Sequence, residues 1–335
     1  MNKNFIKSLA LSIALLFTSS IPVFADINVS RISGYDRYET SINANKKYMN
    51  QANGNLAVIT SGNDFKTALY GSYMASSLNV PYFVNPKHGV RTDILNELKR
   101  LNVNRVYVMG DYNMLDKSVD NTLKSKGIKI ERIRYISSEE FWGPGHGFPI
   151  TELNQVNQII DNTFNTKHLY NNWYGNMLIN SNAFPDILSV IPFAAEISKN
   201  FTFGLVDYSD EIRFLPPYDF VVGGINTIPE YFPESIRFNG QNRYETAVEI
   251  AKEYKVFLNK DIKTAIIVNG ENYPDALSSS LVATQNNGAV LLTQLNKLNE
   301  YTAKYIKDNN IKNVIIVGGE KSVSRNVENE LKSLN

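Results

Sequence analysis

Internal repetition is the feature of this sequence that most restricts its fold. The tetrapeptide Arg-Tyr-Glu-Thr occurs at 37–40 and again at 243–246, each time shortly after a glycine. Two longer segments recur at nearly the same offset: AVITSGNDFKTAL (57–69) as AIIVNGENYPDAL (265–277), and RVYVMGD (105–111) as NVIIVGGE (313–320). Half of that offset is about 103 residues, and weaker copies lie there, MLINSNAFPDIL (177–188) and YDFVVGGIN (218–226). The chain therefore contains three related units.

Each unit alternates the signals of strands and helices. In the third unit, runs rich in Ile and Val have the length of buried strands, at 266–268, 290–292 and 314–317. Between them, apolar residues follow the spacing of a helix at Tyr244, Ala247, Val248 and Ala251. Strands separated by helices predict α/β units with mainly parallel sheets.

We expect unit boundaries at 26–130, 131–232 and 233–335. The second unit diverges, because it lacks Arg-Tyr-Glu-Thr. If Arg134 opens this unit, the interval from Arg134 to Asp186 is also longer than the equivalent interval in the first and third units. The excess falls near 138–150, where FWGPGHGFP is rich in Gly and Pro and predicts a loop. No long Gly/Ser- or Pro-rich linker separates the units, so we expect a compact monomer.

The first 25 residues have the pattern of a secretion signal. Lys3 and Lys7 precede an apolar stretch at 9–17, and Val23-Phe24-Ala25 resembles a signal peptidase site. The apolar stretch is too short for a membrane span, and no second one follows it. We therefore expect a secreted chain that starts at Asp26 and lies at the cell surface without a transmembrane or lipid anchor.

Composition argues against several classes of chemistry. The chain has no cysteine, so it forms neither disulfides nor thiolate sites. Its formal charge changes from +1 to −1 once Lys3 and Lys7 are removed, so no overall positive field attracts nucleic acid. The histidines do not have the spacing of a zinc site (His88, His146 and His168). We expect neither a metal nor a cofactor.

Part of the repeated tetrapeptide has a structural explanation. Asp36 stands three residues before Glu39, as Asn242 stands before Glu245, and this spacing is typical of a helix cap. A glycine before each cap allows a sharp turn out of the preceding strand.

The arginine and tyrosine of the motif need another explanation, because a first-turn arginine contributes nothing to a cap. Arg37, Tyr38, Arg243 and Tyr244 are therefore candidate ligand-binding residues, since a guanidinium can hold a phosphate or carboxylate of a bound polymer. The alternative, which we favour, is that the arginines tie neighbouring units together.

The loops GENYPDAL and SNAFPDIL each follow a strand and open a helix with Pro-Asp. Asp186 and Asp275 would lie at the carboxyl ends of strands, where α/β sheets usually bind ligands. An acidic residue near a helix start is equally an ordinary structural feature. The first unit has Lys66-Thr67 instead, which excludes three identical catalytic aspartates.

The aligned units share R-[IF]-x-G-x-[DN]-R-Y-E-T, then [SN]-G-x-N-[FY]-x-x-A-L, then a strand that ends in V-x-G-[GD]. This pattern resembles the clostridial cell wall binding repeat 2 family, over essentially the whole mature chain. The resemblance implies three Rossmann- or Toprim-like modules about a pseudo-threefold axis. It also implies non-covalent attachment of surface-layer and other exported proteins to an anionic wall polysaccharide of a Gram-positive bacterium.

The resemblance adds further candidate binding residues. The family's apolar motif matches Val290-Leu291-Leu292, whereas its counterparts, Tyr82-Phe83-Val84 and Phe203-Gly204-Leu205, depart from it. Partners implied are the wall polymer and, beside it, other surface-layer proteins.

Two functions therefore compete. The first is a non-catalytic module that binds an anionic wall polymer. The second is a secreted wall-modifying hydrolase that uses carboxylates of the divergent second unit. Trp142 and Trp173 could stack on sugars in either case, and core packing explains them equally well.

Overall fold

The computed structural model describes residues 27–143, 147–164, 174–210 and 218–334, and the expected secretion signal at 1–25 lies outside them. The described strands are β1 (Asn28–Ile32), β2 (Leu56–Ser61), β3 (Tyr82–Asn85), β4 (Arg105–Met109), β5 (Lys129–Ile133), β6 (Tyr174–Ile179), β7 (Thr202–Asp207), β8 (Phe220–Val222), β9 (Ile236–Phe238), β10 (Thr264–Asn269), β11 (Gly288–Thr293) and β12 (Asn313–Val317). They form three four-stranded sheets, ordered β3-β2-β4-β5, β7-β6-β8-β9 and β1-β12-β10-β11. The neighbouring strands in these sheets pair in parallel, which confirms the α/β class.

Helices connect the strands and cover the sheets. Their bounds are α1 (Arg37–Tyr48), α2 (Phe65–Leu78), α3 (Thr92–Arg100), α4 (Lys117–Ser125), α5 (Ser138–Trp142), α6 (Glu152–Phe164), α7 (Phe184–Ser198), α8 (Arg243–Leu258), α9 (Ser279–Gln285), α10 (Glu300–Asp308) and α11 (Arg325–Lys332). Short 3-10 helices are η1 (Asn53–Asn55) and η3 (Pro274–Ser278). The helices predicted at both Arg-Tyr-Glu-Thr segments are therefore confirmed.

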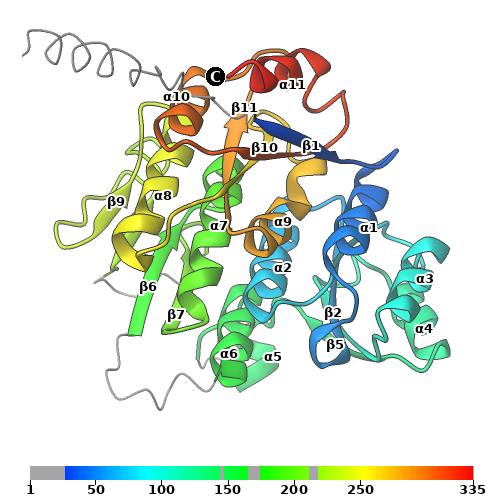
Figure 1. Ribbon diagram of the computed structural model, residues 1–335. Helices are drawn as coiled ribbons and strands as arrows, with labels where there is room; N and C mark the ends of the chain where they lie inside the picture. Colours follow the sequence, from blue (N-terminus) through cyan, green and yellow to red (C-terminus); the bar gives the residue numbers. More distant parts are fainter. Residues whose placement is uncertain (1–26, 144–146, 165–173, 211–217, 335) are drawn as a thin grey trace, which may run out of the picture.

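The opening strand of each unit joins the sheet of a neighbouring unit. β5 opens the second unit but pairs with β4 of the first, and β9 opens the third but pairs with β8 of the second. β1 pairs with β12, so the first strand completes the last sheet and closes the three units into a ring. Figure 1 shows β1, in dark blue, beside the orange and red C-terminal elements. The boundary expected at 130–131 falls inside β5.

Each opening strand carries, near its end, an arginine that binds the neighbouring unit's sheet. Arg31, Arg132 and Arg237 each donate through Nη1 to a glycine carbonyl at the end of the neighbouring strand, at 2.8 Å (Gly318, Gly110 and Gly223). The second unit therefore opens at Arg132 and not, as the sequence led us to expect, at Arg134. Arg134 pairs with Glu140 outside the strand.

The three units meet along a central axis. Helices α2, α7 and α9, one from each unit, pack against one another (Figure 1). Phe65, Phe184 and Tyr273 occupy the same repeat position, and their ring centroids lie 5.3 to 6.4 Å apart. This arrangement is the pseudo-threefold axis that the resemblance implied. One continuous hydrophobic cluster runs through all three units.

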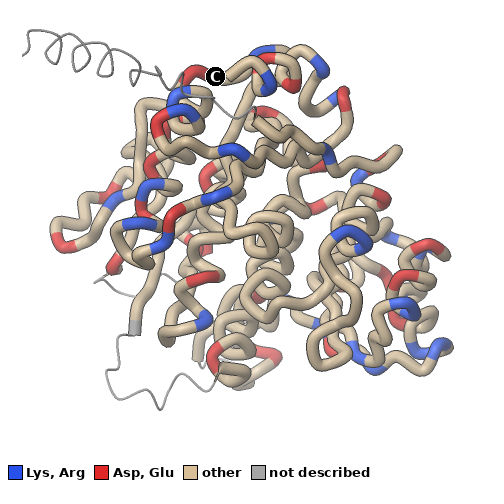
Figure 2. Tube along the Cα trace, viewed as in Figure 1, with Lys and Arg blue, Asp and Glu red and all other residues tan. Residues whose placement is uncertain are grey.

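Most charged residues lie on the outer elements of the molecule. Figure 2 shows basic and acidic residues interspersed along the outer elements, whereas the central helices carry few of either. In the part of the chain that the structure describes, no helix is both long and apolar enough to cross a membrane.

Candidate functional site

The Arg-Tyr-Glu-Thr segments cap helices, as predicted. The Asp36 carboxylate accepts a hydrogen bond from the backbone N–H of Glu39 (2.8 Å), and the Glu39 carboxylate accepts one from the N–H of Tyr35 (2.7 Å). Asn242 and Glu245 make the matching contacts at the start of α8. These bonds satisfy backbone donors that a helix start otherwise leaves unpaired.

The threonine and the preceding glycine belong to the same arrangement. Thr40 Oγ1 accepts a hydrogen bond from the N–H of Gly34 (2.9 Å), and Thr246 accepts one from Gly240 (3.0 Å). A Cβ on Gly34 would lie 2.5 Å from the Cβ of Glu39, so any other residue would displace the cap. The glycine is therefore required by close approach.

The arginine and tyrosine of the motif contact a second glycine. Arg243 donates through Nη1 to the carbonyl of Gly270 (2.6 Å), and Arg37 donates in the same way to Gly62. The adjacent tyrosine packs on this glycine, because a Cβ on Gly270 would lie 3.1 Å from Cε1 of Tyr244. Each of the four residues of the motif thus makes a contact within the protein.

Both arginine bonds stay within one unit, so the expected direct hydrogen bond to a neighbouring unit is not what the structure shows. However, α1 and α8 follow strands that belong to the preceding sheet. Each arginine lies on a helix that follows a strand of one sheet, and it donates a hydrogen bond to the end of a strand in the next sheet. In unit one the guanidinium of Arg91 also lies over the Tyr38 ring, 5.3 Å from its centre.

The second unit lacks the turn that carries these two residues. Asn45 in α1 exchanges hydrogen bonds with the backbone of Tyr82, and Asn157 in α6 does the same with Leu205. Measured from this shared contact, α6 begins at Glu152, one turn later than α1 begins. The sequence alignment predicted the loss of the motif but not the shortened helix.

The residues around the missing turn have changed with it. Thr151 and Asn154 cap α6 reciprocally, with both hydrogen bonds at 3.2 Å. Ser181 occupies the position of Gly62 and Gly270. No Arg-Tyr turn packs there in unit two, so a side chain at position 181 has room.

An open cleft of about 560 Å³ lies between the second and third units, at the carboxyl ends of the strands. Its lining residues come from the start of α7, from the loop after β8 and from the Arg-Tyr-Glu-Thr turn of α8: Asn182–Asp186, Gly224–Thr227, Asn239–Arg243 and Thr246. The structure therefore brings together Asp186 and Arg243, two of the candidates identified from sequence.

Asp186 lies in this cleft in an unusual environment. Burial raises its pKa to about 6, although the charge of Arg243 acts in the opposite direction. Its Oδ2 would lie 2.9 Å from a Cβ on Gly223, which has φ +103°. No residue that the structure describes donates a hydrogen bond to its carboxylate. The equivalent Asp275 accepts one from Ser322 Oγ (2.6 Å).

The corresponding junction between units one and two is filled by an ion-pair network. Lys66 Nζ lies 3.0 Å from Asp207 Oδ2 and 2.9 Å from Asp210 Oδ1. Tyr70 donates to Asp207, as does the N–H of Ser181 (3.0 Å). Burial opposes ionisation of Asp207, but Lys66 and these hydrogen bonds lower its pKa to about 2.

Sequence analysis missed this network, because its members replace uncharged residues at three separate places. Lys66 stands where the other units have Pro185 and Pro274. Tyr70 stands where they have serine. Asp207 takes the place of an apolar residue, which only the strand register reveals.

The register also corrects the family's apolar motif. Leu292 pairs with Val268, and Asp207 pairs with the equivalent Ile179, so the counterpart in unit two is 205–207 and not Phe203-Gly204-Leu205. Val290, Leu291 and Leu292 are at most 1% exposed. These side chains pack in the core, where a polymer cannot touch them.

Other candidates lie apart from the cleft. Trp142 is exposed and stacks edge-on against Phe141, whereas Trp173, His146 and His168 lie outside the described residues. Within the described residues, no group of three or more His, Asp or Glu side chains could hold a metal ion.

Three α/β units that exchange their opening strands, with an Arg-Tyr turn at two of their three junctions, define a modular repeat protein. The chain belongs to the cell wall binding domain 2 (CWB2) family, whose model matches residues 31–120 and 237–328. These ranges cover much of the first and third units.

Two curated relatives come from Bacillus subtilis (strain 168). N-acetylmuramoyl-L-alanine amidase LytC is 25% identical over 345 residues, which is 99% of this chain and 63% of that protein. Amidase enhancer is 35% identical over 153 residues, 44% of this chain and 20% of that protein. The chain thus spans less than two thirds of the length of each relative.

Two solved structures from Clostridium difficile share the fold. Cwp6 aligns with a TM-score of 0.71 over 92% of this chain and 48% of that one. Cwp8 aligns with a TM-score of 0.70 over 100% of this chain and 56% of that one. Both are 16% identical in sequence, so this likeness concerns the fold.

Proposed function

We propose that this chain is a secreted, non-catalytic module that attaches non-covalently to an anionic polysaccharide of a Gram-positive cell wall. Membership of the cell wall binding domain 2 family is the observation that carries this proposal. The proposal includes secretion directed by the signal at 1–25 and a location at the cell surface. A surface-layer assembly in which other wall proteins are neighbours is consistent with it.

We place one polymer contact in the cleft between units two and three. Arg243 is exposed and uses Nη1 for the Gly270 carbonyl, which leaves its other N–H groups for a phosphate or carboxylate. The cleft is open, as a site for a chain-like ligand must be. Arg37 and Tyr38 are the equivalent groups at the junction of units three and one, with Asp275 opposite them.

The junction of units one and two supports binding less well. It lacks the Arg-Tyr turn, and the Lys66 charge is taken up by Asp207 and Asp210. We therefore expect two polymer contacts for each chain rather than three.

A wall hydrolase remains the second candidate, because one relative is named an amidase. Three carboxylates of the second unit are engaged in ion pairs, Glu140 with Arg134, and Asp207 and Asp210 with Lys66, whereas no described residue forms an ion pair with Asp186. A general acid must hold a proton near the working pH, and Asp207, with a pKa of about 2, does not.

Sedimentation with purified walls tests both functions together. We expect the mature chain to sediment with intact walls, to be released by high salt, and to bind poorly to walls stripped of secondary polymers. Release of sugars or peptides from the walls would instead support the hydrolase. Equal binding to stripped walls would contradict the anionic polymer.

A further inference from the structure

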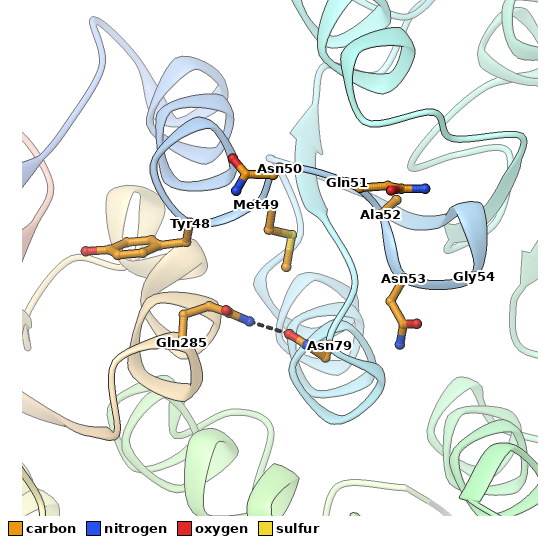
Figure 3. A pocket seen from close by; sticks show the side chains of 9 residues that line it. All are labelled: Tyr48, Met49, Asn50, Gln51, Ala52, Asn53, Gly54, Asn79 and Gln285. Atoms are coloured by element: carbon orange, nitrogen blue, oxygen red, sulfur yellow. Dashed lines mark hydrogen bonds between the residues drawn. The ribbon is translucent and has the colours of Figure 1, made fainter.

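A second hollow lies at the opposite, amino-terminal edge of the sheets, between units one and three. This open groove of about 580 Å³ is lined by Tyr48–Gly54 and by the two helix ends that carry Asn79 and Gln285. Figure 3 shows the segment Tyr48–Gly54 along one side, and Asn79 and Gln285 joined by a hydrogen bond on the other. None of these residues belongs to the cleft described above.

Carboxamides are the most frequent side chains in this groove. Five of its nine lining residues carry them (Asn50, Gln51, Asn53, Asn79 and Gln285), and none of the nine carries a charge. A carboxamide offers a donor and an acceptor side by side, which matches the paired hydroxyls of a sugar. A phosphate or carboxylate would require cationic partners instead. The ring of Tyr48, half-buried and with Nζ of Lys47 5.6 Å from its centre, adds an aromatic surface of the kind that binds a sugar face.

Part of the groove is held in place before any ligand arrives. Gln285 Nε2 donates to Asn79 Oδ1 across the two units, and Asn53 Nδ2 donates to the carbonyl of Leu78 (3.0 Å). Asn79 ends α2 in the left-handed conformation (φ 55°). Prior ordering reduces the entropy that binding must overcome.

Other amides remain available. Asn50 and Gln51 are exposed, and their side chains make no hydrogen bond to any residue that the structure describes. The groove thus combines side-chain amides from two units that are held by hydrogen bonds with the amides of Asn50 and Gln51, which are not.

The same edge is charged at the neighbouring junction. Between units two and three, Lys260 and Lys199 lie 2.7 Å and 2.6 Å from the carboxylate of Glu196. The residues that line the groove therefore differ in charge from those at the same edge between units two and three.

We propose that the groove between Tyr48–Gly54, Asn79 and Gln285 binds uncharged sugar residues through hydrogen bonds to its carboxamides. This site is separate from the cleft of the proposed function, and its ligand class differs from the anionic polymer proposed there.

Titration of the mature chain with N-acetylglucosamine trisaccharide, followed by NMR of the side-chain amide signals, tests this inference. We expect saturable shifts in the signals that disappear in the Asn79→Ala and Gln285→Ala variants. Asn50→Ala combined with Gln51→Ala should weaken binding about fivefold or more without altering the melting temperature, because these residues support no described contact. Asn121→Ala, an exposed asparagine on α4, is the matched control.

Three results would overturn the inference: no saturable shift, shifts elsewhere only, or equal binding by the Asn50/Gln51 variant and the control. Inorganic phosphate that displaces the trisaccharide from these signals would refute the uncharged ligand class. No cell wall is used, so this test and the wall sedimentation experiment can fail independently.

Discussion

Two junctions of one ring, built on the same repeat, have diverged in opposite directions. Between units two and three, an open cleft keeps Arg243 near Asp186, which has a raised pKa of about 6. Between units one and two, Lys66 and Asp207 form an ion pair in place of proline and an apolar residue. The comparison shows that one junction of the repeat has an open cleft where its counterpart is filled by an ion pair.

The largest effect should come from breaking the ion pair at the junction of units one and two. Asp207→Ala leaves the partly buried Lys66 with Asp210 as its remaining ion-pair partner and removes the acceptor of the Tyr70 hydroxyl, and should lower the free energy of unfolding by about 2–3 kcal/mol, a value reduced because Lys66 is one-third exposed. Urea denaturation measures this change. The exposed pair of Glu140 offers the control, since Glu140→Ala should change the free energy of unfolding much less than Asp207→Ala does.

A triple variant sharpens the same comparison. Lys66→Leu, Tyr70→Ser and Asp207→Leu together replace the pair by apolar residues and keep the backbone N–H at position 66 that donates to the N-cap Asp64, so they should recover most of the lost stability. If the triple variant is as unstable as Asp207→Ala alone, the junctions are not equivalent in the way that the register indicates.

The next effect concerns wall binding at the open junction. Arg243→Ala removes charge-assisted hydrogen bonds to an anionic polymer, and should weaken wall binding about 10- to 100-fold. Its bond to Gly270 is also lost, so we expect the free energy of unfolding to fall by about 1 kcal/mol. A large loss of stability with binding reduced only in proportion would show that the arginine is structural alone.

A smaller effect tests the glycine that accompanies the Arg-Tyr turn. In Gly62→Ala, the new Cβ would lie 2.8 Å from Tyr38 Cε1 and 2.9 Å from Arg37 Cδ. We expect a loss of about 1–2 kcal/mol in the free energy of unfolding from this overpacking. Gly319→Ala, where a Cβ would meet no atom within 4 Å, should cost less. Equal costs would contradict the steric explanation.

The smallest effect concerns Asp186. Its folded pKa of about 6 exceeds the usual value of a free carboxyl, so the ionised form destabilises the folded chain above pH 6, and this cost disappears as the pH falls toward 4. Asp186→Asn should therefore raise the free energy of unfolding at pH 7.5 by about 1 kcal/mol, and should flatten its dependence on pH between 4 and 6.

The same titration bears on wall binding. Protonation of Asp186 removes a negative charge beside Arg243, so we expect binding of an anionic polymer to strengthen as the pH falls from 7.5 to 5.5 in the native chain but not in Asp186→Asn. An identical pH dependence in both would remove Asp186 from the site. Sedimentation at constant ionic strength measures it.

Local patterns in the sequence were sufficient for much of this structure. Hydrophobic spacing placed the strands of the third unit, and the interval from Asp36 to Glu39 placed a helix cap. The register of the second unit could not be obtained in this way. Apolar runs there tolerate a shift of two residues, because side chains on a strand alternate between faces and a shift of two restores the same face.

By itself, the sequence determined three α/β units, their capped helices and the family to which they belong, because these depend on contacts between residues close together in the chain. Only the tertiary structure decided that each opening strand joins a neighbouring sheet, that Val290–Leu292 lies out of reach of any polymer, and which junction is open. Lys66 and Asp207 are far apart in sequence and individually unremarkable. Their pairing follows from the packing of unit two against unit one, which brings the end of β7 against the start of α2.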